Sequence, residues 1–208
     1  MSALSAERWQ RLWLRAIKQA PPEGGYERLL AMYAEPHRHY HNQEHIADCL
    51  KEFDLVRQLA VEPDAVEFAI WFHDAVYDTR AGDNEERSAQ LVQDWLKEAG
   101  LTDAFANSVR QLVLATKAHD ATLHPDAPLL VDVDLSILGQ VPERFWEYER
   151  AIRAEYEWVE EEMFKSKRAE ILERFVARPR IYLTELCFGR FEKQARVNLK
   201  DSIGRLRG

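Results

Sequence analysis

Cysteine is scarce in this chain: its 208 residues include only Cys49 and Cys187, which are not at CxxC spacing. This argues against a disulfide-stapled scaffold and predicts two reduced thiols in a reducing compartment. Long apolar runs are missing too, since none approaches the ~20 residues that a membrane span needs. Met1–Leu4 lead directly into a charged amphipathic segment, which is not typical of a signal peptide. We therefore expect a cytoplasmic location and no membrane contact.

Positive charge is also in short supply. The chain has 28 lysines and arginines against 36 aspartates and glutamates, and its formal net charge is −8. Nucleic acid polymers and anionic membranes are bound by basic patches, so both are unexpected partners. A small anionic ligand is compatible with this charge, because a metal ion and one or two arginines make a local positive site. Linkers, repeats and low-complexity tracts are absent, which predicts one domain over residues 1–208.

Apolar residues recur at three- and four-residue steps along nearly the whole chain, which predicts helices. Residues 129–135 also alternate as a strand would, but a single strand has no partner here. Asp83, with Glu86 three residues on, and Thr102 are expected to cap two of the helices, and Gly100 to end one. We predict an all-α bundle of about nine to ten helices. The helical stripes cover residues 9–17, 26–33, 45–60, 66–73, 91–96, 105–119, 130–138, 145–159, 171–176 and 191–203.

A His-Asp pair, His73-Asp74, stands at the end of one apolar helical run. His45 lies 28 positions before His73, and Asp134 lies 60 positions after Asp74. His45, His73 and Asp134 all fall on apolar stripes, where an unpaired charge is costly. Either histidine taken alone is better explained as a hydrogen-bonded core residue. One shared divalent cation, however, would satisfy all four side chains and leave coordination positions open.

These residues follow the order H…HD…D, which resembles the HD-domain superfamily of metal-dependent phosphohydrolases. The flanking segments are similar to those of a bacterial subfamily of predicted HD phosphohydrolases, and this likeness covers nearly the whole chain. It implies an HD-type helical fold, with a metal-site core at about residues 25–140 and C-terminal helices 142–208 packed on it. The similar segments are 35–46, 71–78, 83–89, 131–139, 180–182 and 195–199.

The segment from His73 to Thr79 is also similar to the HDxxED segment of enzymes that remove pyrophosphate from guanosine alarmones. Those enzymes use the Glu-Asp pair to position or activate the attacking water. This chain keeps Asp78 but has Tyr77 in place of the glutamate, and a phenol is a poor base near neutral pH. The candidate catalytic residues are therefore Asp78, one helical turn after Asp74 if the helix continues, and Glu85. Asp132 is a candidate for orienting the metal ligands.

Arg38 and His41, in a histidine-rich loop, are the candidate substrate-binding residues, because a guanidinium can grip phosphate oxygens bidentately. His41, Glu44 and His45 also match H-x-x-E-H, a zinc-protease motif with both histidines on one helix. Asn42 is expected to start that helix and to leave His41 outside it. His119 continues an apolar stripe and is the candidate ligand for a second metal.

The function predicted from these residues is hydrolysis of a phosphoester by one divalent ion: Mn, Mg, Co, Ni, Fe or Zn. The metal ligands would be His45, His73, Asp74 and Asp134, and the substrate a nucleotide or a related small phosphorylated metabolite. The alternative hypothesis is a non-catalytic metal- or nucleotide-binding sensor, and a zinc protease is a third. A homodimer is left open by the sequence.

Overall fold

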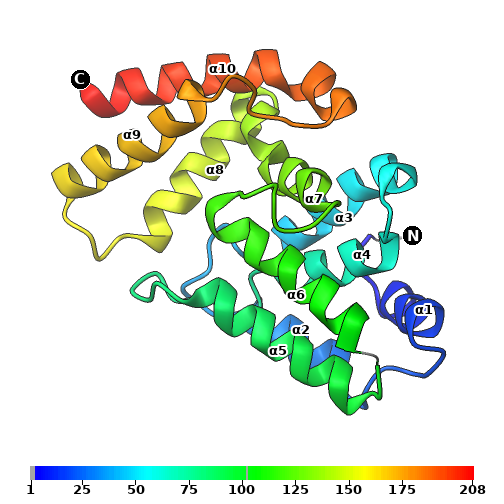
Figure 1. The fold of residues 1–208 in the computed structure, drawn as a ribbon. Coiled ribbons are helices and arrows are strands. Elements are labelled where there is room, and N and C mark those ends of the chain that lie inside the picture. The colour runs from blue at the N-terminus through cyan, green and yellow to red at the C-terminus, as the bar shows by residue number, and fades with distance from the viewer. Residues whose placement is uncertain (1–2, 102) are drawn as a thin grey trace. The chain divides into compact units, whose positions relative to one another are not determined.

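The computed structural model describes residues 3–101 and 103–208. Within these ranges it is helical without a strand, as Figure 1 shows, so the all-α prediction of nine to ten helices is confirmed. Residues 129–135 are helical. The α-helices are α1 (Ala6–Ala16), α2 (Gly25–Met32), α3 (Gln43–Val56), α4 (Pro63–Phe72), α5 (Asn84–Glu98), α6 (Asp103–Ala118), α7 (Ala127–Asp134), α8 (Pro142–Glu155), α9 (Glu161–Ala177) and α10 (Glu185–Arg207); the 3-10 helices are η1 (Arg57–Leu59) and η2 (Leu135–Gly139).

The chain forms two compact units, Met1–Val131 and Asp132–Gly208. The boundary falls inside α7, and each unit is described by itself below. The single domain over residues 1–208, with a metal-site core at about 25–140, stays a prediction. Among the described helices, none has both the length and the apolar character that crossing a membrane requires.

The predicted helix ends were only partly right. Gly100 adopts a left-handed conformation (φ 76°) just after α5, and the Leu101 amide donates to the Leu96 carbonyl, as at a glycine-terminated helix end. Asp83 occupies the position before α5, but its side chain makes no capping hydrogen bond, so this prediction was wrong. Thr102 lies outside the described residues.

Helix α4 is buried on every side. The sequence indicated a single apolar stripe, yet each side chain from Ala65 to Phe72 is buried. Helices α1, α3, α5 and α6 all pack against it. A helix without a polar face is stabilised by burial of its entire apolar surface rather than by helix propensity. The polar groups on it and at its ends must therefore be paired inside the protein.

An aromatic cluster joins α4 to its neighbours. The ring of Trp9, on α1, lies at its centre, with the centroids of five other aromatic rings between 5.3 and 6.4 Å away. Three indole N–H groups in this cluster are buried without a hydrogen-bond partner among the described residues, so packing rather than hydrogen bonding holds the rings. The five neighbouring rings are Trp13, Phe68, Trp71, Phe72 and Trp95, and the three indoles belong to Trp9, Trp13 and Trp71.

The start of α4 is capped from a distant loop. Asp126, which is 3% exposed, accepts hydrogen bonds from the backbone amides of Val61 (2.8 Å) and Glu62 (2.7 Å). These amides precede the first turn of α4, where a negative charge is also favoured by the helix dipole. Asp126 therefore fixes the point at which the buried helix begins.

Glu67 is the one acidic side chain buried within α4, at 1% exposure. Its carboxylate accepts from Arg8 Nε (2.7 Å) and Arg15 Nη2 (2.8 Å), and it also contacts the Arg57 guanidinium. Arg8 is itself 8% exposed and forms a bidentate pair with Asp54 (2.8 Å for each bond). The network compensates the burial of Glu67 and ties α4 to α1 and η1.

Glu67→Gln tests this network. We expect a loss of about 3 kcal/mol in the free energy of unfolding, because Arg8 and its neighbours would keep their charge without the buried carboxylate. Urea unfolding measures it. Asp48→Asn on α3 is the control, since Asp48 and its partner Lys51 are exposed and such pairs contribute at most about 1 kcal/mol. Equal, small effects of the two changes would contradict a structural role for Glu67.

In the second unit, α10 packs closely on η2. The Asn198 side-chain amide donates to the carbonyls of Leu138 (2.9 Å) and Gln140 (2.8 Å). Gly139 lies between them, and a Cβ added there would meet Phe191 Cβ at 2.5 Å. This distance is too short for any side chain, so the close approach of α10 requires glycine at this position.

Candidate metal centre

Helix α3 presents His45 to the interior of the first unit. Asn42 precedes the helix, and its Oδ1 accepts from the amides of Glu44 (2.8 Å) and His45 (3.4 Å). This side-chain cap starts α3 after His41, as the sequence indicated. The zinc-protease motif requires both histidines on one helix, and His41 and His45 do not share one. Glu44 is exposed.

His73 and Asp74 follow the last residue of α4. The His73 amide still donates to the Ala69 carbonyl (2.8 Å), so the residue closes the final turn of the helix. The residue is 2% exposed, and its Nδ1 lies 3.0 Å from the Ile70 carbonyl oxygen. Because a carbonyl oxygen can only accept, Nδ1 carries a proton, and in the neutral ring Nε2 then presents a lone pair. This is the tautomer and the tether that metal-binding histidines use.

Three ligand atoms meet at this point. His73 Nε2 lies 3.0 Å from Asp74 Oδ2 and 3.1 Å from His45 Nε2, and His45 Nε2 lies 3.6 Å from Asp74 Oδ2. Ligands bound at about 2.0–2.2 Å from a first-row ion stand roughly 3 Å or slightly more from one another. When the ring is neutral, the lone pair of His73 Nε2 and the carboxylate oxygen would repel at this separation, so either a proton on Nε2 or a shared metal ion must lie between them. The donor set therefore fits one divalent ion.

The charge of Asp74 suits the same role. Burial raises the pKa of its carboxyl, but without a metal ion the protonated forms of His73, His41 and His45, together with the hydrogen bond that a protonated His73 donates, outweigh burial. The pKa of Asp74 consequently falls well below its ordinary value, and the carboxylate stays ionised. An anionic oxygen beside two imidazole nitrogens is a ligand set that binds transition-metal ions.

The backbone after α4 is held by Tyr33 and Arg38. The Tyr33 hydroxyl, which is buried, donates to the Trp71 carbonyl (3.0 Å) and accepts from the Asp74 amide (3.2 Å). Arg38 donates to the carbonyls of Asp74 (2.6 Å) and Ala75 (3.0 Å), which the end of the helix leaves without intrahelical partners. The two side chains fix the position from which Asp74 projects.

These hydrogen bonds give Arg38 a role in holding the backbone, whereas the sequence indicated that it binds substrate phosphate. Its guanidinium also donates to the His41 carbonyl (3.0 Å) and to Glu35 Oε2 (2.9 Å), and its side chain is fully buried. Four of its five N–H groups are therefore bound to protein acceptors. Arg38 supports the loop that carries the candidate metal ligands, and its hydrogen bonds leave little capacity for a phosphate clamp.

His41 lies beside the candidate ligands. Its ring centroid is 5.9 Å from that of His45 and 4.4 Å from that of Tyr77, and the side chain is half-buried. It is therefore close enough to meet a group bound next to His45. Substrate binding by His41 stays a prediction.

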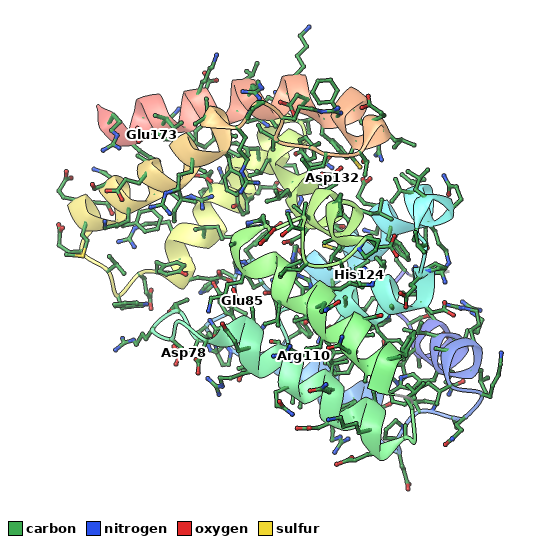
Figure 2. The ribbon with its side chains drawn as sticks, viewed as in Figure 1. Asp78, Glu85, Arg110, His124, Asp132 and Glu173 are labelled. Carbon is green, nitrogen blue, oxygen red and sulfur yellow. The ribbon has the colours of Figure 1, made fainter. Side chains whose placement is uncertain are left out.

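The two candidate bases lie in the loop after α4 and in the first turn of α5, as Figure 2 shows. Helix α4 ends at Phe72, so the condition under which Asp78 would lie one helical turn from Asp74 is not met. Asp78 is exposed; its Oδ1 accepts from the Arg80 amide (2.9 Å), and its backbone pairs with the Asn84 side chain. These contacts shape a turn. Glu85 is half-buried, and its role as a base stays a prediction.

Asp132 and Asp134 belong to the second unit. Asp132 is fully buried and accepts from the Leu183 amide (2.8 Å), the Thr184 amide (2.7 Å) and the Thr184 hydroxyl (2.6 Å). It therefore anchors the segment before α10, a structural role that the sequence did not indicate. Asp134 is half-buried at the end of α7, and its part as a fourth metal ligand stays a prediction.

His119 is not on a helix. Helix α6 ends at Ala118, and His119 has a left-handed backbone (φ 51°), so the helical stripe predicted to carry it stops one residue earlier. Among the described residues, no group of candidate metal ligands includes it. A second metal at His119 thus has no support from the geometry.

Cys49 is a close neighbour of the candidate metal ligands. The sequence indicated only that this cysteine lies in the core. Its Sγ lies 3.8 Å from each ring nitrogen of His45, one turn earlier on α3, and the side chain is 2% exposed. The i, i+4 spacing was a readable signal. The thiol contacts the imidazole edge and limits how the His45 ring can rotate.

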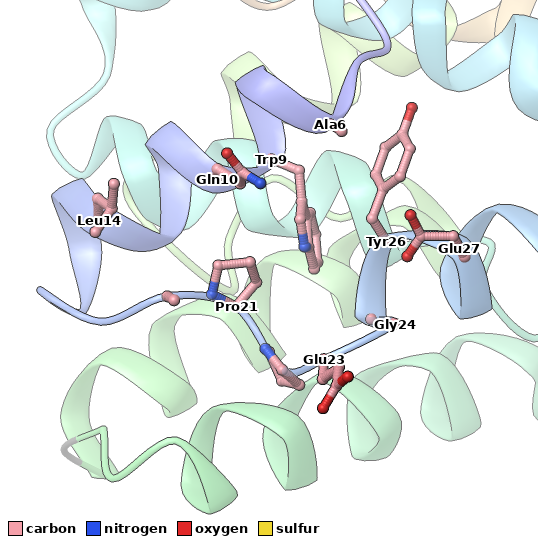
Figure 3. Close-up of a pocket in the computed structure, with 12 residues that line it drawn as sticks. Ala6, Trp9, Gln10, Leu14, Pro21, Glu23, Gly24, Tyr26 and Glu27 are labelled. Carbon is pink, nitrogen blue, oxygen red and sulfur yellow. The ribbon is translucent and has the colours of Figure 1, made fainter.

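A pocket of about 470 Å³ lies between α1 and the start of α2, as Figure 3 shows. Its titratable lining residues are Glu23, Tyr26 and Glu27, and it contains no histidine. It shares no lining residue with the cluster of His45, His73 and Asp74. The candidate metal ligands therefore do not line this pocket.

No family model, curated protein or solved structure matches this chain. The similarity to HD phosphohydrolases therefore rests on the motif residues themselves, and the ligand geometry above is independent of it.

Arg38→Lys tests the supporting role of Arg38. Lysine cannot reach all four acceptors, so we expect the free energy of unfolding to fall by about 2–4 kcal/mol and bound metal to be lost more readily. Urea unfolding and metal analysis measure the two effects. Arg11→Lys on α1, where the arginine is exposed, is the control. Unchanged stability with a raised KM for a phosphoester would instead support a phosphate clamp.

Proposed function

We propose that this chain is a divalent-metal-dependent phosphohydrolase that acts on a nucleotide or a related small phosphorylated metabolite. The observation that carries the proposal is the triangle of His45 Nε2, His73 Nε2 and Asp74 Oδ2, with edges of 3.1, 3.0 and 3.6 Å. Three protein ligands with further positions open are typical of catalytic metal sites, whereas structural zinc sites are closed by four. With Asp134 as a fourth ligand, the site would stay open only for an ion that takes five or six ligands, as Mn, Fe, Co and Ni do.

A divalent ion held there would lower the pKa of water and polarise a phosphoryl oxygen. Residues of the chain would orient the metal ligands and set their charge. His73 is oriented by the Ile70 carbonyl, and Asp74 is held as a carboxylate by the surrounding histidines. Two imidazoles and a carboxylate favour Mn, Fe, Co, Ni or Zn over Mg.

The alternative is a sensor that binds metal or nucleotide without turnover. What favours it is the position of Tyr77, where the similar alarmone hydrolases have a glutamate. The Tyr77 ring packs against His41 (4.4 Å between centroids) and lies over the Arg38 guanidinium (5.3 Å), so it contributes packing rather than a carboxylate. Asp78 or Glu85 must then serve as base, or the reaction must proceed without a carboxylate base.

Metal content is the first test. We expect the purified protein to carry about one divalent ion per chain and His73→Ala to lose it, because the variant lacks one corner of the ligand triangle. Elemental analysis measures the content. His39→Ala is the control, since that histidine is exposed on the same loop as His41. Full metal retention in His73→Ala, or no metal in the wild type after reconstitution, would refute the site.

Turnover is the second test. With added manganese, cobalt or nickel we expect phosphate release from nucleoside phosphates, abolished by a chelator and by His73→Ala. A panel of nucleotides and sugar phosphates with a phosphate assay measures it. Binding of metal and nucleotide without phosphate release would support the sensor. Cleavage of casein that Glu44→Gln abolishes would support the protease.

A further inference from the structure

A second pocket, of about 400 Å³, opens beside the segment that follows Asp74. One wall is formed by residues 75–78, and the others by Met32, Glu35, His37 and Arg87. All of these belong to the first unit. The pocket does not include His45, His73 or Asp74. A ligand whose reacting phosphate lay at those residues could therefore place only its non-reacting part in the pocket.

Arg87 is the unusual residue of this lining. Among the described residues, its guanidinium makes no hydrogen bond or ion pair; its backbone amide donates to the Asp83 carbonyl (3.0 Å) in the first turn of α5. The two acidic residues of the pocket are already engaged: Glu35 accepts from Arg38 (2.9 Å), and Asp78 accepts from the Arg80 amide (2.9 Å). Arg87 thus has a complete set of donors for an anionic group, which it can bind bidentately.

Two aromatic rings form another part of the lining. The rings of His37 and Tyr77 are parallel within 6°, with centroids 6.3 Å apart, and His37 Nε2 lies 2.9 Å from the Tyr77 carbonyl oxygen. The contacts of Tyr77 with His41 and Arg38 keep its ring in place. Together with Met32 and Val76, the faces of these rings form the apolar part of a lining that is otherwise polar. Such surfaces bind planar heterocycles by stacking.

We propose that this pocket recognises the non-reacting part of the substrate, with Arg87 binding an anionic group and the His37–Tyr77 surface binding a planar ring. The inference rests on the proposed phosphohydrolase function and narrows it. The substrate class is a nucleotide that carries a second negative group besides the phosphate that is released. Arg87 is then a specificity-determining residue that acts through substrate binding.

Arg87→Ala tests the proposal with two substrates, adenosine 5′-phosphate and adenosine 3′,5′-bisphosphate, in the presence of manganese. We expect the variant to raise KM for the bisphosphate about tenfold or more, as loss of a charged phosphate contact does, with kcat and metal content unchanged. KM for the monophosphate should change little. Arg110→Ala is the matched control: this arginine lies on α6, as Figure 2 shows, and its guanidinium also has no protein partner among the described residues.

The outcomes separate this proposal from the proposed function. Turnover by the wild type with equal KM values in Arg87→Ala would overturn the pocket and leave the hydrolase intact. If the wild type releases no phosphate, the hydrolase fails, and calorimetric titration with the bisphosphate decides the pocket. Binding at least about tenfold weaker in Arg87→Ala than in the wild type would support it. Equal binding, or none in the wild type, would overturn it.

Discussion

The burial of α4 on every side is the constraint on which the first unit depends. A helix without a solvent-exposed face is stabilised by burial of its whole apolar surface, but each polar group on it or at its ends must be hydrogen-bonded or paired inside the protein. The structure meets this demand at three places. Asp126 accepts hydrogen bonds from the amides before the helix. The carboxylate of Glu67 is paired with arginines. Arg38 donates hydrogen bonds to the carbonyls after the helix.

The candidate metal site is a consequence of how that helix ends. His73 closes the last turn, and Asp74 follows directly, so both project from backbone that Tyr33 and Arg38 hold in place. His45 arrives from α3, whose first turn is fixed by Asn42. Protein contacts therefore bring the three ligand atoms together. Such a site is preorganised, and binding an ion would require little rearrangement of the chain.

Helical periodicity predicted much of this arrangement, since it placed His45 and His73 on inward faces and identified the all-α class. It failed where tertiary contacts decide the outcome. Asp78 would lie one turn from Asp74 only if the helix continued, but α4 stops at Phe72. Arg38 was assigned to phosphate because its residue type suits phosphate, whereas carbonyl groups at the end of a distant helix are its partners. Asp126 and Arg87 gave no periodic signal, because a loop cap and an unpaired surface guanidinium depend on what the fold brings near them.

The aromatic cluster around Trp9 has a practical consequence for spectroscopy. Trp9, Trp13, Trp71 and Trp95 all belong to the first unit and are buried, whereas the second unit contains Trp146 and Trp158, of which Trp158 is 47% exposed. Indole emission shifts to longer wavelength when water reaches the ring. Heating or denaturant would therefore change the emission mainly through the loss of packing around α4. Tryptophan fluorescence would follow the integrity of the scaffold beneath His73 and Asp74, while far-ultraviolet circular dichroism would follow the helices of both units together.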